Sequence, residues 1–116
     1  MAKKRENAAK VTISSGNVFA DLGFENPEEE LAKAKLATHI WSVISQRHLT
    51  QAAAGKIMGL DQPKVSALMN GRLANFSSDR LMRFLTALGK DVDIVVRDAP
   101  KKRGKGRVRV LTGIAA

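Results

Sequence analysis

Three polar side chains lie close together near the middle of the chain, at Gln62, Lys64 and Ser66. A glutamine amide presents a donor and an acceptor together, so it can bond the N6 and N7 atoms of adenine with two hydrogen bonds. Lys64 and Ser66 can reach guanine acceptors or a phosphate. Their neighbours Pro63 and Ala67 offer only apolar contacts, Ala67 to a thymine methyl group. The pattern is typical of a base-reading surface.

The element that must present these residues is one of two short helices joined by a sharp turn. Thr50 is a good N-cap for a helix over 51–58. Gly59 ends that helix, because a residue without Cβ accepts positive φ. Asp61 is a second N-cap, and it predicts a second helix over about 62–70.

The spacing of Gly55, Gly59 and Val65 indicates how the two helices pack. Gly55 is small where the helices must approach closely, and a mid-helix glycine otherwise costs about 1 kcal/mol relative to alanine. Gly59 makes the turn, and Val65 holds the second helix against the core. The three residues predict a helix-turn-helix whose second helix enters a DNA major groove.

The same stretch carries a resemblance to a known family. Its motifs are Leu49-Thr-Gln51, Gly59-Leu-Asp-Gln62, Val65-Ser66 and Asn70-Gly-Arg72. They resemble the phage-repressor-like (Cro/CI, or XRE) helix-turn-helix family. With residues 15–23 and 88–96 added, the pattern over about 13–97 resembles the HigA-type antitoxin branch.

The resemblance implies a lambda-repressor-like helical bundle, and it implies roles for several residues. In the family, the glutamine matching Gln62 reads bases, and the glutamine matching Gln51 bonds the phosphate backbone and braces the base-reading glutamine. Asn70 and Arg72 match the phosphate contacts that follow the second helix. Arg80 is a further phosphate candidate, with a solvated surface charge as the alternative.

Composition limits the class of protein. A chain of 116 residues without cysteine fits one domain without disulfides or thiolate metal sites. It shows neither an apolar run of the roughly 18 residues that span a bilayer nor a secretory signal, so we expect a soluble, cytoplasmic protein. His39 and His48 lack a third ligand at helical spacing, so we expect no metal site and no cofactor.

Charge is unevenly distributed in a chain of net charge +9. Residues 47–90 hold seven basic and two acidic side chains, and residues 98–116 hold six and one. Residues 11–32 hold five acidic and no basic side chains. A polyanionic partner explains a positive half that contains the helix-turn-helix. The alternative is that basic tails only keep a small protein soluble.

The first quarter of the chain divides into three parts. Residues 1–12 are charged and unpatterned, and we expect a disordered basic N-terminus. Residues 13–25 fit a short packed helix or turn, or an apolar and acidic segment that contacts a protein partner. Asn26 and Pro27 predict the start of a helix that runs to about residue 47. Its expected core stripe is Ala37, Ile40, Trp41 and Ile44, flanked by Leu36 and Val43.

After the motif, Ser77 or Ser78 should cap a fourth helix that Gly89 ends, and residues 91–97 alternate with period two. The buried stripe of that helix should be Leu81, Phe84, Leu85 and Leu88. One face of the alternating segment is Val92, Ile94 and Val96, the candidate dimer strand. With 107–112 alternating too, we expect a mainly α bundle over 13–97 with a short C-terminal β-strand or β-hairpin, or a ribbon shared between two subunits. The alternative is a flexible basic tail over 98–116.

These features together predict a sequence-specific repressor that binds double-stranded operator DNA as a homodimer. The resemblance implies the antitoxin of a type II toxin-antitoxin pair, with a RelE- or HigB-like toxin as partner. The alternatives are a stand-alone phage or plasmid repressor, or a protein- or RNA-binding module on the same fold. An enzyme is not expected, because no phosphate-cradling glycine loop or nucleophile–base pair is present in the sequence. We expect the protein neither to bind a membrane nor to act on a small-molecule substrate.

Overall fold

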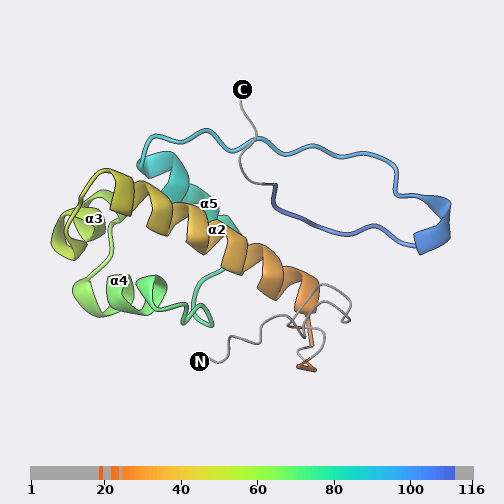
Figure 1. Cartoon of the computed structure of the whole chain (residues 1–116), viewed down its shortest axis with the longest axis horizontal. Helices are drawn as coiled ribbons and strands as arrows, with labels where there is room; N and C mark the ends of the chain where they lie inside the picture. The colour runs from red at the N-terminus through yellow and green to blue at the C-terminus, as the bar shows by residue number, and fades with distance from the viewer. Residues whose placement is uncertain (1–18, 20–21, 24, 112–116) are drawn as a thin grey trace.

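The computed structural model describes residues 19, 22–23 and 25–111, and within them the regular structure is helical (Figure 1). The elements are α2 (Pro27–Gln46), α3 (Gln51–Met58), α4 (Gln62–Met69), α5 (Ser78–Ala87) and the short 3-10 helix η2 (Lys101–Arg103). The four expected α-helices are therefore present. The expectations for residues 1–12, for residues 13–25 in large part, and for 112–116 lie outside the described residues.

Side-chain caps start three of the helices. The hydroxyl of Thr50 accepts from the backbone N–H of Ala53 at 3.0 Å, and the carboxylate of Asp61 accepts from that of Lys64 at 3.1 Å. Ser77 caps α5 in the same way. Each cap satisfies a backbone donor that the first turn of a helix leaves without a partner. Asn26 precedes α2 without such a bond, so that helix begins on its proline and its acidic first turn.

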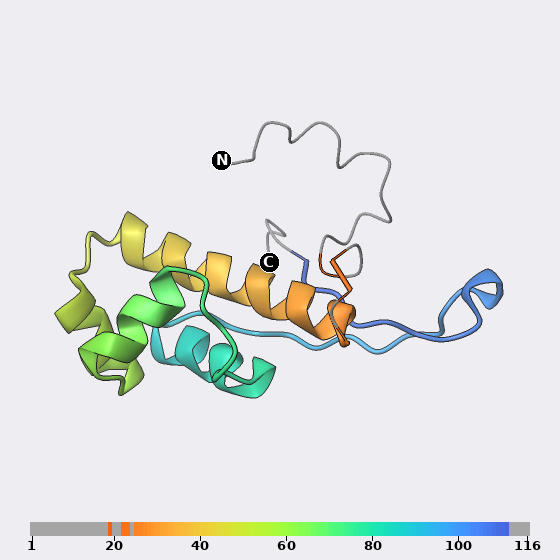
Figure 2. The ribbon, with the colours of Figure 1, turned by 90° about the horizontal axis from the view of Figure 1, so that it is seen from below.

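The core lies where α2 packs against α5 and where α3 and α4 close one end of that pair (Figures 1 and 2). Ile40 of α2, Val65 of α4 and Leu81 of α5 are fully buried, as is Leu88 just after α5. All four positions of the stripe expected on α5 are buried. This packing fixes α3 and α4 on the rest of the domain.

Trp41 was expected in the core of α2, and that expectation is wrong. Its side chain is 52% exposed, whereas its neighbour Ile40 is fully buried. The buried face of α2 instead passes through Lys33, which forms an ion pair with Glu30 at 3.7 Å. Because α5 covers only one face of α2, a residue one position further around the helix lies at the margin of the contact.

The expected C-terminal β-strand or β-hairpin is also wrong. The stretches on either side of η2 are extended and together form a long arm, but neither is a strand (Figure 1). Among the described residues, no backbone hydrogen bond joins 91–99 to 105–111. An isolated two-stranded hairpin is marginal in water. Alternating side chains alone do not make a β-strand, because a strand also needs a second backbone to pair with.

Candidate nucleic-acid interface

Helices α3 and α4 meet at a contact that leaves no room for a side chain on Gly55. A Cβ atom built there would lie 2.7 Å from the carbonyl oxygen of Leu60 and 3.0 Å from Cγ2 of Val65. The backbone N–H of Leu60 donates to the carbonyl of Gly55 at 2.8 Å, which closes the turn. Gly59 has φ +72°, in the left-handed region that favours glycine. The two helices are therefore held in a helix-turn-helix arrangement.

The first turn of α4 faces solvent. Gln62, Pro63 and Lys64 are all exposed, while Val65 turns into the core. Among the described residues, the side chains of Gln62 and Lys64 have no hydrogen-bond or ion-pair partner. Their polar groups are free to bind an external ligand. The Asp61 carboxylate beside them already caps the helix, so it accepts one bond within the motif.

The second half of α4 is less available to a ligand than its first turn. Ser66 and Ala67 are half-buried, and Ala67 packs against the core. The side-chain amide of Asn70 donates to the carbonyl oxygen of Ser66 at 2.8 Å and lies 3.3 Å from its hydroxyl. Asn70 therefore ends the helix and holds Ser66, while its own amide oxygen remains open to a donor.

Two more of the expected DNA contacts lie at the ends of the motif. Gln51 is the first residue of α3 and is exposed. Arg72 follows α4, and its backbone N–H donates to the carbonyl of Ala67 at 2.9 Å, while its side chain is exposed. Among the described residues, Arg72 has no ion-pair partner. Its guanidinium is available for a phosphate.

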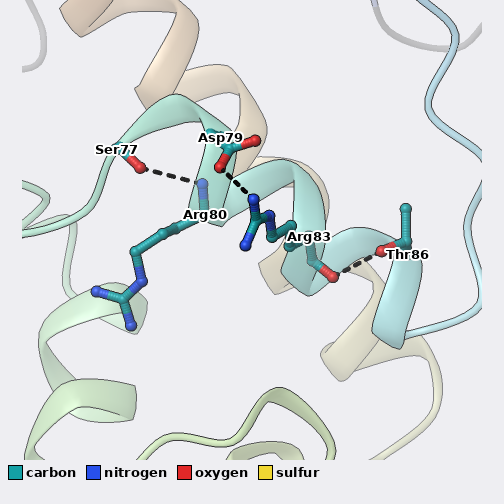
Figure 3. A network of polar contacts seen from close by, with 5 residues as sticks. All are labelled: Ser77, Asp79, Arg80, Arg83 and Thr86. Atoms are coloured by element: carbon teal, nitrogen blue, oxygen red, sulfur yellow. Dashed lines mark hydrogen bonds and ion pairs between the residues drawn. The ribbon is translucent and has the colours of Figure 1, made fainter.

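Arg80 has a structural role that the sequence did not suggest. Its guanidinium carbon lies 5.3 Å from the ring centre of Phe76 and 5.5 Å from that of Phe84, and one of its nitrogens donates to the carbonyl of Asn75 at 3.4 Å. Figure 3 shows this side chain pointing away from the neighbouring Asp79–Arg83 ion pair of 3.0 Å. Arg80 therefore stacks on the edge of the core, while its guanidinium stays exposed and uses one donor within the described residues.

An open groove near the end of α4 was not foreseen from the sequence either. Its volume is about 750 Å³, and it lies between α2 and the segment after α4. Trp41 and Met69 supply apolar lining, and Lys33 lies at the same groove with its side chain 7% exposed. Trp41 fits the three-four spacing of the expected core stripe, so no signal in the sequence indicated its place at this groove.

The described residues thus place a polar helix start on the surface, with basic side chains at its flanks. Lys56, Lys64 and Arg72 are exposed around the motif. No group of three potential metal ligands occurs among the described residues, and none of their helices is long and apolar enough to cross a bilayer. A fixed pair of crossed helices with an exposed polar first turn defines a helix-turn-helix protein.

The comparisons with known proteins agree with this class. A family described as "Helix-turn-helix domain" matches residues 18–97, and the chain belongs to it. A solved structure named, provisionally, as an XRE family transcriptional regulator is 45% identical, with a TM-score of 0.69. The match covers 74% of this chain and 97% of that one, so the chain is a member of the XRE family of helix-turn-helix proteins. No curated protein matches.

Proposed function

We propose that this protein is a transcriptional repressor that binds operator DNA through the first turn of α4. The observation that carries the proposal is the exposure of Gln62 and Lys64, without partners, on a helix whose position the Gly55 contact fixes. A rigid helix with free donor and acceptor groups is what base reading in the major groove requires. Gln62 reads adenine, and Lys64 contacts guanine or a phosphate.

Phosphate contacts come from the flanks of this helix. Gln51 and Arg72 are exposed at either end of the motif, and Asn70 keeps its amide oxygen free to accept while its nitrogen bonds Ser66. Such contacts orient the protein on the duplex and provide salt-dependent affinity. In this assignment Ser66 and Ala67 contribute less base reading than the residues of the first turn. Pro63 contributes an apolar contact, and Arg80, which stacks on Phe76 but stays exposed, is a further phosphate contact.

A helix of eight residues covers few base pairs, so we propose a homodimer with two recognition helices about 34 Å apart. We further propose that the regulator is the antitoxin of a toxin-antitoxin pair and represses its own operon. The likeness of residues 15–23 and 88–96 to HigA-type antitoxins supports this. A RelE- or HigB-like toxin would then bind the protein. Co-expression with the neighbouring gene tests it, since a stand-alone repressor would neither bind its product nor relieve its toxicity.

The DNA-binding proposal is tested by fluorescence anisotropy on fragments of the protein's own promoter. Gln62→Ala should weaken binding to the true operator by about 1–3 kcal/mol and relax preference at one base pair. Arg72→Ala should weaken binding to all DNA alike and reduce the slope of log K against log salt by about one.

Arg83→Ala is the matched control, because it removes the same charge from an exposed residue outside the motif. Its salt slope should equal that of the wild type. Wild-type affinity in both the Gln62 and the Arg72 variants would refute the assignment of the interface.

A further inference from the structure

The segment 91–97, just after α5, exposes apolar side chains and an unpaired backbone. Ile94, Val95 and Val96 are 75%, 82% and 91% exposed. The segment leaves α5 and runs outward along the molecule toward η2 (Figures 1 and 2). No hydrogen bond or ion pair between described residues involves any of its seven residues. An extended, β-branched segment with free donors and acceptors is a template for another backbone.

The described part of the same chain does not supply that backbone. Residues 105–111 form the other half of the arm, but they make no backbone hydrogen bond with 91–97. Three consecutive exposed apolar residues are a liability unless a partner covers them. The partner is therefore sought in another chain.

The sequence of this segment is complementary to itself when two copies run antiparallel about Ile94. Asp91 then lies opposite Arg97 of the second copy, and this opposite-charge pair occurs twice. Val92 lies opposite Val96, and the two Ile94 side chains face each other. Val92, Ile94 and Val96 fall on one face, and the other face carries the charged pairs at its ends, with Asp93 opposite Val95 between them.

The side chain of Val92 indicates where the apolar face would lie. Val92 is half-buried and packs against the core of its own domain, whereas Ile94 and Val96, on the same face, are exposed. In a pair of chains this face is turned toward the two domains rather than toward water. Packing against the domains supplies the stability that an isolated pair of extended segments lacks.

We propose that two copies of this chain associate through residues 91–97, paired antiparallel about Ile94, with reciprocal Asp91–Arg97 ion pairs. A single chain forms no strand here, and the proposal concerns only the contact between two chains. The contact would form the dimer of the proposed regulator, so its biological role rests on the proposed function. The contact itself can be measured without DNA.

The charged pairs give the first test, by sedimentation equilibrium of the full chain. Asp91→Arg sets two arginines against each other twice, and the dimer dissociation constant should rise about tenfold or more. Arg97→Asp should have the same effect. The double variant Asp91→Arg/Arg97→Asp restores opposite charges and should return the constant to within about threefold of wild type. Equal constants for all four proteins, or a monomeric wild type, would overturn the proposal.

The second test uses the lack of cysteine in the chain. Ile94→Cys places the two thiols directly opposite each other, within disulfide reach, so mild oxidation should give a linked dimer. Val96→Cys is the matched control, because its two copies would lie about 14 Å apart along the paired segments and should not link. Linkage through Val95→Cys instead would show pairing centred on Val95, with Asp93 against Arg97. That outcome would reject the register.

The two proposals fail separately. A wild type that dimerises as predicted but binds no double-stranded DNA would refute the repressor function and leave the contact standing. Operator binding by a dimer that is insensitive to the 91 and 97 charge changes would refute the contact alone. Because Asp91 and Arg97 are exposed and lie outside the core, the circular dichroism spectra of the charge variants should match that of the wild type, as expected for folded proteins.

Discussion

Gly55→Ala places a methyl group at the closest approach of α3 and α4. The added Cβ would lie 2.7 Å from the carbonyl oxygen of Leu60 and 3.0 Å from Cγ2 of Val65. Neither neighbour can yield easily, since the first is a backbone atom in the turn and the second belongs to a fully buried side chain. The helices must therefore separate by some tenths of an ångström.

Two opposing effects set the size of the change in stability. Alanine in place of glycine within a helix favours folding by about 1 kcal/mol. Overpacking typically costs about 1–3 kcal/mol, and a clash with backbone belongs at the upper end of that range. We expect the Gly55→Ala variant to lose about 1–2 kcal/mol of unfolding free energy, which lowers Tm by about 5–10 °C. Displacement of α4 should also weaken operator binding in the protein that remains folded.

Urea unfolding followed by circular dichroism measures the effect, with two controls from the same chain. Ala52→Gly changes an exposed residue of the same helix and should cost about 1 kcal/mol through propensity alone. Gly106→Ala adds a methyl group where nothing lies within 4 Å, and the unfolding free energy should change little. A Gly55→Ala protein more stable than wild type would refute the reasoning, because propensity would then outweigh any contact.

Three further predictions concern single side chains. Arg80→Ala should lower the unfolding free energy by about 1 kcal/mol through loss of its stacking on two phenylalanine rings, whereas Arg83→Ala in an exposed ion pair should cost at most about 0.5 kcal/mol; equal losses in urea titrations would contradict this. Asp61→Ala removes the cap of α4 and should cost about 1 kcal/mol by thermal melting, with Asp61→Asn retaining most of the stability. Trp41→Ala should cost well under the 3–5 kcal/mol typical of a buried tryptophan, and its fluorescence, the only tryptophan signal in the chain, should be strongly quenched by acrylamide in the folded wild type.

The helices could be placed from the sequence because the signals that start and end them are local. Thr50 and Asp61 each reach a backbone N–H three residues ahead, so the identity of one residue and its spacing determine the cap. The apolar stripe of α5 could be predicted because three-four spacing selects one face of a helix.

What the sequence could not supply was the set of neighbours from elsewhere in the chain. Trp41 fits an apolar helix face, but no periodicity shows where α5 stops covering α2. Arg80 has the position of a phosphate contact, and only the fold brings two aromatic rings beneath it. The error on Trp41 and the missed stacking of Arg80 both come from reading a residue by its own element alone.

The period-two pattern over 91–97 failed for a related reason. Alternation reports which side chains would share a face, but a strand also needs a second backbone, and the described part of this chain supplies none to that segment. The recognition helix α4 also needs a second copy, because its eight residues extend only about 12 Å and cannot define an operator alone. A second copy of the chain would supply both missing parts. It would add a second recognition helix for the operator and a second backbone for the segment 91–97. The spacing of the two recognition helices on DNA would then depend on residues that never touch the duplex.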